Sequence, residues 1–403
     1  MQRWLTSAAF ALTLPAIAAM AATTGPHPAP LPAPYAGAYQ PQGVDEIGIW
    51  HEDDESEAKL AASPLVIHDE ALTGYVRSVL CATVGQDRCG ATRVYIVRVP
   101  SFNASMSPNG TMRVQSGLLL RVRSESELGA VLGHEFGHFE KRHTLNKFKA
   151  ARRGSDLLSW ALVLGSMGGP QGGQSFNNLQ WSVLGNLYRF GRDQEREADV
   201  VGLGYLNASH LRATAASRVW RTLILEQEAS ASARGLKKPD FQRVAFFASH
   251  PPEGERAQYL YDLAEADGAA RDEGDARYAA AMATWLPMFL DDQIKLNDFG
   301  ASDFIIAHLG EAGWTATLWR ARGDLYRSRG QQRDLMNAAD FYAKALTLDP
   351  DLAEARRGLG IALVKTGRTT EGAAALRRYL QLKPDAADAA IVRMILSTLG
   401  GAQ

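Results

Sequence analysis

His134-Glu135-Phe136-Gly137-His138 brings two imidazoles and a carboxylate together within a few residues. At 3.6 residues per turn, positions 134 and 138 lie on one face of a helix, so both imidazoles can reach the same metal ion. Zinc is typically bound by two neutral imidazoles and a carboxylate, with a fourth position left open for water. We therefore expect one zinc ion per chain, held in part by His134 and His138, with Glu135 as the general base beside the open position.

The residues around this motif predict a helix inside a mainly helical domain. Ser124 and Glu127 have the spacing of a capping box, and apolar residues follow at helical spacing through about Arg142. Gly133 and Gly137 keep this helix slim, which lets a neighbour or a substrate approach closely.

Two strand-like runs precede the helix. Alternating β-branched residues predict a strand over residues 93–99, which Pro100 ends, and a second run covers residues 111–120 after a turn-rich stretch. We expect an edge strand within 111–120 that pairs with an extended peptide. The fold class is thus α+β, mainly helical, with a small sheet.

The third metal ligand is expected from a later helix, running from about Leu187 through Leu203. Glu195 and Asp199 are four residues apart and share one face of that helix, so we assign Glu195 to the metal. Asp199 would orient a ligand histidine through its other ring nitrogen. The alternative for each carboxylate is a surface ion pair with Arg192 or Arg196, and for Glu197 that alternative is favoured.

The N-terminus has the layout of a secretory signal. Arg3 precedes a short apolar run, and Ala19-Met20-Ala21 offers a cleavage site, so residues 1–22 are predicted to be a signal peptide. Six prolines in the following stretch predict an extended linker over residues 23–43. The apolar run 157–167 is too short for a membrane span, and we expect a buried or substrate-facing helix there. The glycine-rich residues 168–173 after it predict a mobile loop.

Composition and cysteine count narrow the class of protein further. The chain has 403 residues, of which 46% are apolar, and a formal net charge of −1, which gives no reason to expect nucleic acid as a partner. In a secreted chain, Cys81 and Cys89 favour a disulfide over two free thiols.

The C-terminal part contains a helical repeat. Pro350 and Pro384 end two similar segments 34 residues apart, which is the period of tetratricopeptide repeats. Trp319, Gly323 and Tyr326 have the spacing typical of the first helix of such a unit. We expect a catalytic domain over residues 44–270, connecting helices over 271–313, and repeats with a capping helix over 314–400. Because two repeats make a short stack, they should pack against the catalytic domain or the connecting helices.

The motif and the later E-x-x-x-D sequence together resemble the CAAX prenyl protease/HtpX family of gluzincin endopeptidases. Further similarities are Asn103-Ala104, the Ser116-Gly117-Leu118-Leu119 run, His143, and Ser249-His250-Pro251-Pro252 followed by Arg256. They cover about residues 90–260. The resemblance implies a zincin-type fold and a role for Asn103 and Ala104 in substrate binding. The paired membrane helices of the integral-membrane members are missing here. A signal peptide plus repeats is instead similar to the periplasmic BepA-type branch, which acts in outer-membrane protein quality control.

His250 carries two interpretations from this resemblance. It could occupy the fourth zinc position and keep the enzyme latent, or it could act with Arg256 to stabilise the oxyanion that develops on the substrate carbonyl. A turn histidine is the structural alternative. His143 is expected to be a structural cation at a helix terminus.

These observations together lead to one functional expectation and one alternative. We expect a zinc endopeptidase, secreted to the periplasm of a Gram-negative bacterium, that cleaves unfolded or misassembled envelope proteins. Its repeats would bind substrate or the outer-membrane assembly machinery. The alternative is a latent or inactive protease that acts mainly as a chaperone or scaffold.

Overall fold

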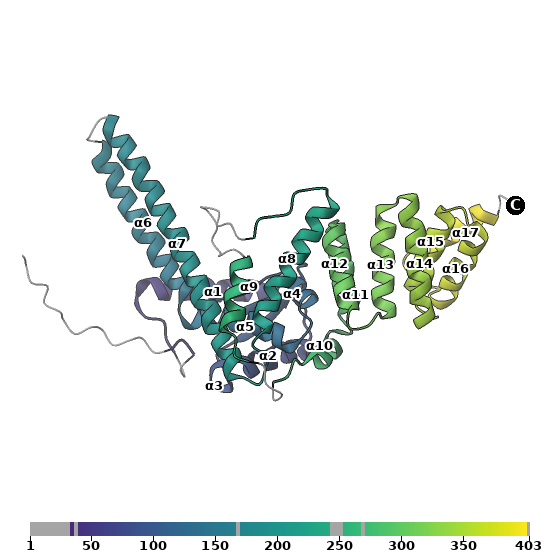
Figure 1. The fold of residues 1–403 in the computed structure, drawn as a ribbon, viewed down its shortest axis with the longest axis horizontal. Coiled ribbons are helices and arrows are strands. Elements are labelled where there is room, and N and C mark those ends of the chain that lie inside the picture. Colours follow the sequence, from purple (N-terminus) through teal and green to yellow (C-terminus); the bar gives the residue numbers. More distant parts are fainter. Residues whose placement is uncertain (1–32, 36–38, 167–169, 242–252, 267–270, 401–403) are drawn as a thin grey trace, which may run out of the picture.

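The computed structural model describes residues 33–35, 39–166, 170–241, 253–266 and 271–400. The chain is helical apart from one small sheet (Figure 1), which confirms the expected α+β, mainly helical class. The elements up to the end of the catalytic region are α1 (Gly43–Ala61), α2 (Glu70–Val84), α3 (Gln86–Cys89), β1 (Arg93–Val97), β2 (Ala104–Met106), β3 (Thr111–Gln115), α4 (Ser116–Arg121), α5 (Glu125–Glu140), α6 (His143–Ser166), α7 (Pro170–Ala208), α8 (Ala215–Ala233) and α9 (Glu253–Leu263).

The sheet has the strand order β1-β3-β2, with β1 parallel and β2 antiparallel to β3. The expected edge strand within residues 111–120 is therefore wrong, because β3 lies in the middle and β2 forms the edge. Residues 116–121 are also helical rather than extended. Gly117 permits this turn, since a Cβ at that position would lie 2.3 Å from the carbonyl oxygen of Pro100. The other edge of the sheet is covered, because Val66 forms a bridge with Val97.

A crossing of small residues joins α5 to α7. Gly202 lies so close to α5 that a Cβ there would meet the backbone nitrogen of His134 at 2.8 Å. On the facing helix, Cβ atoms at Gly133 and Gly137 would lie 3.2–3.4 Å from their nearest neighbours, which include Gly202 and Ala198 of α7. The slim helix face expected from the sequence thus receives α7. This backbone contact sets the distance between the metal motif and the carboxylates of α7.

The described part of the predicted linker packs onto the domain. Tyr35 lies with its ring 5.7 Å from that of Phe136. The hydroxyl of Tyr39 donates to the carboxylate of Glu46 in α1. These two tyrosines therefore connect the described part of the predicted linker to the domain. The predicted signal peptide, residues 1–22, lies outside the described residues.

The pair α6 and α7 extends away from the rest of the domain (Figure 1). The predicted loop at residues 168–173 is wrong from Pro170 onward, because α7 begins there. Residues 168 and 169 lie outside the described part. The disulfide between Cys81 and Cys89 is present and joins the end of α2 to α3.

The C-terminal helices stand in a row beside the catalytic region (Figure 1). They are α10 (Asp275–Met282), α11 (Leu286–Lys295), α12 (Phe299–Gly310), α13 (Ala316–Arg329), α14 (Gln332–Leu348), α15 (Ala353–Lys365), α16 (Thr369–Leu382) and α17 (Ala389–Gly400). The helix α12 contacts both α8 and α13, so the last helices pack on the connecting helices, as the sequence predicts. Tyr342 is fully buried in contact with Gly323 and Gly358, where a Cβ would meet its ring at 2.3–2.7 Å.

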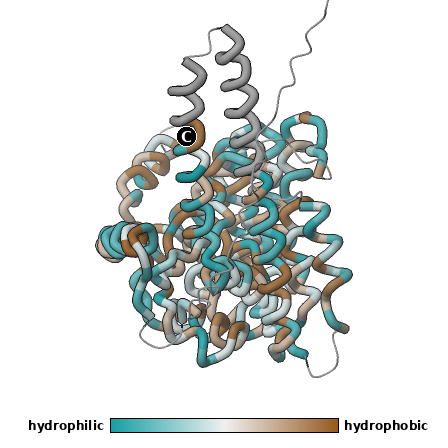
Figure 2. Tube along the Cα trace, turned by 90° about the vertical axis from the view of Figure 1, so that its left-hand side faces the viewer, coloured by the Kyte–Doolittle hydropathy of each residue, from teal (hydrophilic) through white to brown (hydrophobic). Residues whose placement is uncertain are grey.

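Hydrophobic and hydrophilic positions alternate along most of the helical turns (Figure 2). Within the described part of the chain, no helix combines the length and the apolar character that crossing a bilayer requires.

Candidate metal centre

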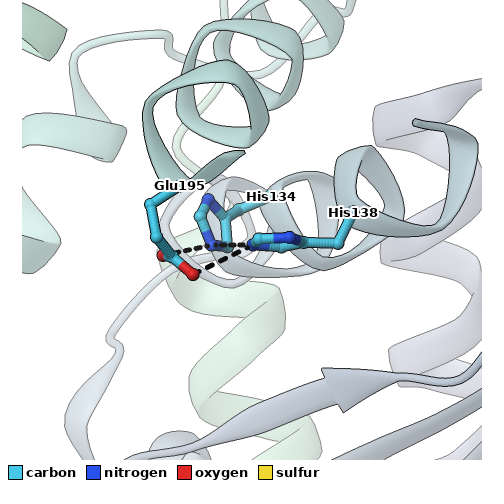
Figure 3. A group of neighbouring side chains, drawn as sticks. All are labelled: His134, His138 and Glu195. Atoms are coloured by element: carbon cyan, nitrogen blue, oxygen red, sulfur yellow. Dashed lines mark hydrogen bonds and ion pairs between the residues drawn. The ribbon is translucent and has the colours of Figure 1, made fainter. Parts of the chain in front are cut away.

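Two helices bring the three expected ligands together (Figure 3). Ser124 caps the N-terminus of α5, because its hydroxyl oxygen accepts a hydrogen bond from the backbone N–H of Glu127. This helix carries His134 and His138. Glu195 reaches toward both imidazoles from α7. Its carboxylate oxygens lie 3.6 Å from Nε2 of His134 and 3.6 Å from Nε2 of His138, and the two nitrogens are 3.0 Å apart.

These distances fit a zinc ion. In a tetrahedral site with bonds of about 2.0–2.1 Å, neighbouring ligand atoms are about 3.3 Å apart. The observed separations of 3.0 and 3.6 Å lie on either side of that value. The three side chains are 13–17% exposed, so they are largely shielded yet open on one side. His134, His138 and Glu195 could therefore hold a zinc ion with little rearrangement.

Asp199 lies one helical turn after Glu195 and supports His134 from behind. One carboxylate oxygen lies 2.9 Å from Nδ1 of His134, the ring nitrogen that faces away from Glu195. This is the contact that the sequence predicts for Asp199. It fixes the orientation of the imidazole and leaves Nε2 free for a metal.

Arg256 of α9 holds Asp199 in turn. Its Nε and one terminal nitrogen donate to the two oxygens of Asp199 over 2.8 and 2.6 Å, and its other terminal nitrogen lies 3.8 Å from Glu195. The guanidinium is 3% exposed and stacks 3.6 Å above the ring of Trp220. Because its nitrogens face these two carboxylates, we replace the expected oxyanion role of Arg256 by a positioning role.

His143 supports the second ligand histidine, which the sequence interpretation missed. Its Nδ1 lies 2.9 Å from Nδ1 of His138, and its Nε2 lies 3.3 Å from the carboxylate of Glu197. His143 is 4% exposed and begins α6, so it is not the helix-terminal cation that we expected. Glu197 lies 3.6 Å from Nζ of Lys141 and 3.3 Å from Nε2 of His143. The sequence signal for this contact was the K-R-H segment, which places His143 five residues after His138.

The surroundings shift the pKa values of the two ligand histidines in opposite directions. Burial lowers the pKa of His134, but the Asp199 carboxylate outweighs burial and raises the pKa to about 10. Burial, reinforced by charge on His134, lowers the pKa of His138 to about 3. Burial alone would raise the pKa of Asp199, yet His134 and Arg256 hold it below its ordinary value. Burial also lowers the pKa of His143, so a neutral imidazole faces His138.

The ligands open into a cavity of about 550 Å³, within the range typical of ligand sites. Glu135 lines this cavity beside the ligand residues. Residues 102–106 form another part of the lining, so Asn103, Ala104 and the edge strand β2 border the cavity as their expected substrate role requires. A third part, mostly apolar, comes from α8. His250 lies outside the described residues, and both interpretations of it stay predictions.

The comparisons with known proteins agree with this geometry. Residues 71–264 match the peptidase family M48, and residues 325–397 match the tetratricopeptide repeat. The first match contains every residue of the candidate metal centre. The second confirms the repeats expected from the 34-residue period.

Several characterised proteins resemble the catalytic part of the chain. The beta-barrel assembly-enhancing protease of Yersinia pestis is 30% identical over 160 residues, which cover 38% of this chain and 32% of that protein. Metalloprotease LoiP of Escherichia coli strain K12 is 29% identical over 182 residues, 44% of this chain and 63% of LoiP. The mitochondrial metalloendopeptidase OMA1 of Schizosaccharomyces pombe is 27% identical over 167 residues, 41% of this chain and 45% of OMA1. The matched region thus spans less than two thirds of each relative.

Proposed function

Residues 71–264 carry a peptidase family M48 domain, and from this premise we propose that the protein is a zinc-dependent endopeptidase that cleaves unfolded polypeptides. The observation that supports it most is the convergence of His134, His138 and Glu195 at the wall of a cavity that Glu135 also lines. A purely structural zinc site has four protein ligands and no open side. Among the described residues, three candidate ligands border the cavity, which suits a catalytic site.

The residues divide the chemistry between them. Bound zinc would polarise the scissile carbonyl and make water more acidic. Glu135 takes a proton from the attacking water and later delivers it to the leaving amine. Asp199 and His143 keep the ligand imidazoles oriented, and Arg256 keeps Asp199 in place.

The edge strand β2 supports an unfolded polypeptide as the substrate class. In the described part of the sheet, no strand pairs with the outer side of β2. A substrate segment added there would be recognised through its main chain, so many sequences would fit but a folded segment would not. We also propose that the protein works in the periplasm, since the N-terminus has the layout of a secretory signal. The name of the Yersinia relative supports misassembled outer-membrane proteins as substrates and their assembly machinery as a partner of the repeats.

The test compares the zinc-loaded wild type with Glu135→Gln on casein, an unfolded substrate. The substitution keeps the shape of the side chain and removes the base. We expect casein cleavage to fall by at least about 100-fold in the variant while both proteins hold one zinc ion per chain. If neither cleaves and both bind zinc, the latent or chaperone alternative replaces this proposal. Equal cleavage by both would refute the role of Glu135.

A further inference from the structure

One face of α8 lines two separate hollows. Ala216, Val219, Trp220, Leu223 and Gln227 border the cavity at the metal centre. A second cavity of about 290 Å³ is bordered by the continuation of that face, with Gln227, Ser230, Ala231 and Arg234. Spacings of three and four residues place all these positions on one side of a helix. Because Gln227 borders both cavities, the two adjoin along this face of α8.

From this continuity we propose that the second cavity is a binding subsite for the same extended polypeptide that enters the metal centre. The inference rests on the proposed function and adds a distal site to it. From Leu223 to Arg234 the helix rises about 16 Å, which corresponds to about five residues of an extended chain. A substrate must therefore continue about five residues beyond the metal cavity to fill the second one.

The chemistry of the distal subsite suits a polypeptide main chain rather than a charged ligand. Arg234 is paired with Asp298 over 2.5 Å, and Ser230 donates to the same carboxylate. The carboxylate of Glu226 is paired with Arg121. The charges of these residues are thus compensated, and the rest of the lining is largely apolar, with Ala231, Leu236, Pro239 and Ala301. Gln227 lies between the two cavities, and its side-chain amide has the donor and acceptor groups that a passing peptide group needs.

The wall of this subsite is formed by α8 and α12, which are in direct contact. Asp298 also caps α12 by accepting from the backbone N–H of Ala301. The two helices touch, since a Cβ at Gly300 would lie 2.2 Å from the carbonyl oxygen of Ala229. Figure 1 shows α8 beside α12, with α13 next in the row. A chain leaving the metal centre along α8 therefore passes beside α12, the helix on which the first repeat helix packs.

The experiment blocks the distal subsite without touching the metal cavity. The only native cysteines, Cys81 and Cys89, are joined in the disulfide, so a cysteine introduced at Arg234 can be labelled alone with a bulky maleimide after folding. Leu225→Cys is the matched control, because Leu225 is 50% exposed on α8 and borders neither cavity. The substrates are a peptide of about six residues, which fits the metal cavity, and one of about 14, which reaches the distal subsite.

We expect the wild type to cleave the longer peptide with a kcat/KM at least about fivefold higher, because added contacts contribute about 1 kcal/mol or more. Labelled Arg234→Cys should lose this advantage and cleave the short peptide as the wild type does, while labelled Leu225→Cys keeps both. An unchanged length preference in labelled Arg234→Cys would overturn the distal subsite and leave the protease intact. Cleavage of neither peptide by the zinc-loaded wild type would instead overturn the proposed function, and the subsite with it.

Discussion

The Nδ1 atom of His143 lies 2.9 Å from Nδ1 of His138, across the ring from the nitrogen that faces Glu195. This contact indicates which ring nitrogens of the two histidines carry a proton. Nε2–H of His143 donates to Glu197, so Nδ1 of His143 accepts from Nδ1–H of His138. The lone pair of His138 Nε2 is then directed at the metal position. Neutral His143 thus does for His138 what anionic Asp199 does for His134.

The first prediction concerns His143. His143→Ala removes the acceptor for His138, and we expect zinc affinity to fall about 10- to 100-fold, as for other groups that orient metal ligands. Competition with a chelator of known affinity measures the loss. His143→Asn keeps an acceptor oxygen and should recover part of it. Identical affinities for the alanine variant and the wild type would show that the contact has no orienting effect.

The second prediction concerns the crossing of α5 and α7. Gly202→Ala places a methyl group against the backbone of His134, and we expect it to destabilise the protein by about 1–3 kcal/mol and to weaken zinc binding. Gly204→Ala is the matched control on the same helix, because a Cβ at position 204 meets nothing within 4 Å. It should instead stabilise α7 by about 0.5–1 kcal/mol. Urea unfolding of both variants distinguishes them, and equal shifts would contradict the tight crossing.

The third prediction concerns Arg256. Arg256→Met removes the guanidinium that donates to both oxygens of the buried Asp199, and we expect a loss of about 3–5 kcal/mol in the free energy of unfolding. Arg196→Met is the control, because Arg196 is 54% exposed and pairs with Glu255 at the surface. Its loss should stay below about 1 kcal/mol. A small loss in the first variant would mean that the pair with Asp199 contributes little.

The fourth prediction concerns Glu57, which fastens α1 to the sheet by accepting from Arg93 and Tyr95. The hydrogen bond from Arg93 lowers the pKa of Glu57 from 4.5 to about 2. A lowered pKa stabilises the folded state above the unfolded pKa, and this stability is lost as the pH falls from about 5 to 2. Because Arg93 is half exposed, we expect Glu57→Gln to cost about 1–2 kcal/mol at pH 7 and almost nothing at pH 2.

Urea unfolding of Glu57→Gln and the wild type at several pH values measures this difference in the free energy of unfolding. Glu55→Gln on the same helix is the control, since Glu55 is 59% exposed, and it should match the wild type at every pH. A difference between Glu57→Gln and the wild type that persists at pH 2 would show that packing, rather than charge, carries the effect.

Periodicity predicted which side chains come together at the candidate metal centre, because their geometry is local to two helices. His134 and His138 share a helix face, and so do Glu195 and Asp199, wherever the rest of the chain lies. The edge strand was missed because β2 has three residues among turn-forming ones, too few for an alternating pattern. The run after β3 became a helix where Gly117 meets Pro100, a contact between segments that no local pattern contains.

The contact between His143 and His138 also could not be predicted from a local sequence pattern. The helix α5 ends at Glu140, and Arg142 takes a left-handed conformation with φ of 52° before α6 begins. The chain therefore reverses between His138 and His143, and helical spacing cannot relate the two rings. Glu46 lies 3.5 Å from Arg142, and Tyr39 stacks 4.9 Å from its guanidinium, so residues far along the chain hold this turn.

The three-residue length of β2 implies an energetic threshold for whatever pairs with it. Asn103 and Ser107 bond to β3, so the alternating main-chain groups of Ala104 and Met106 face outward. Four hydrogen bonds at roughly 1 kcal/mol each would stabilise a paired segment by about 4 kcal/mol. The free energy of unfolding of a typical native domain is about 5–15 kcal/mol, so pairing with β2 is too weak to extract a strand from an intact fold. Selectivity for damaged chains would then not require recognition of a particular sequence. It would follow from the difference between the free energy of pairing with β2 and the free energy of unfolding of the substrate.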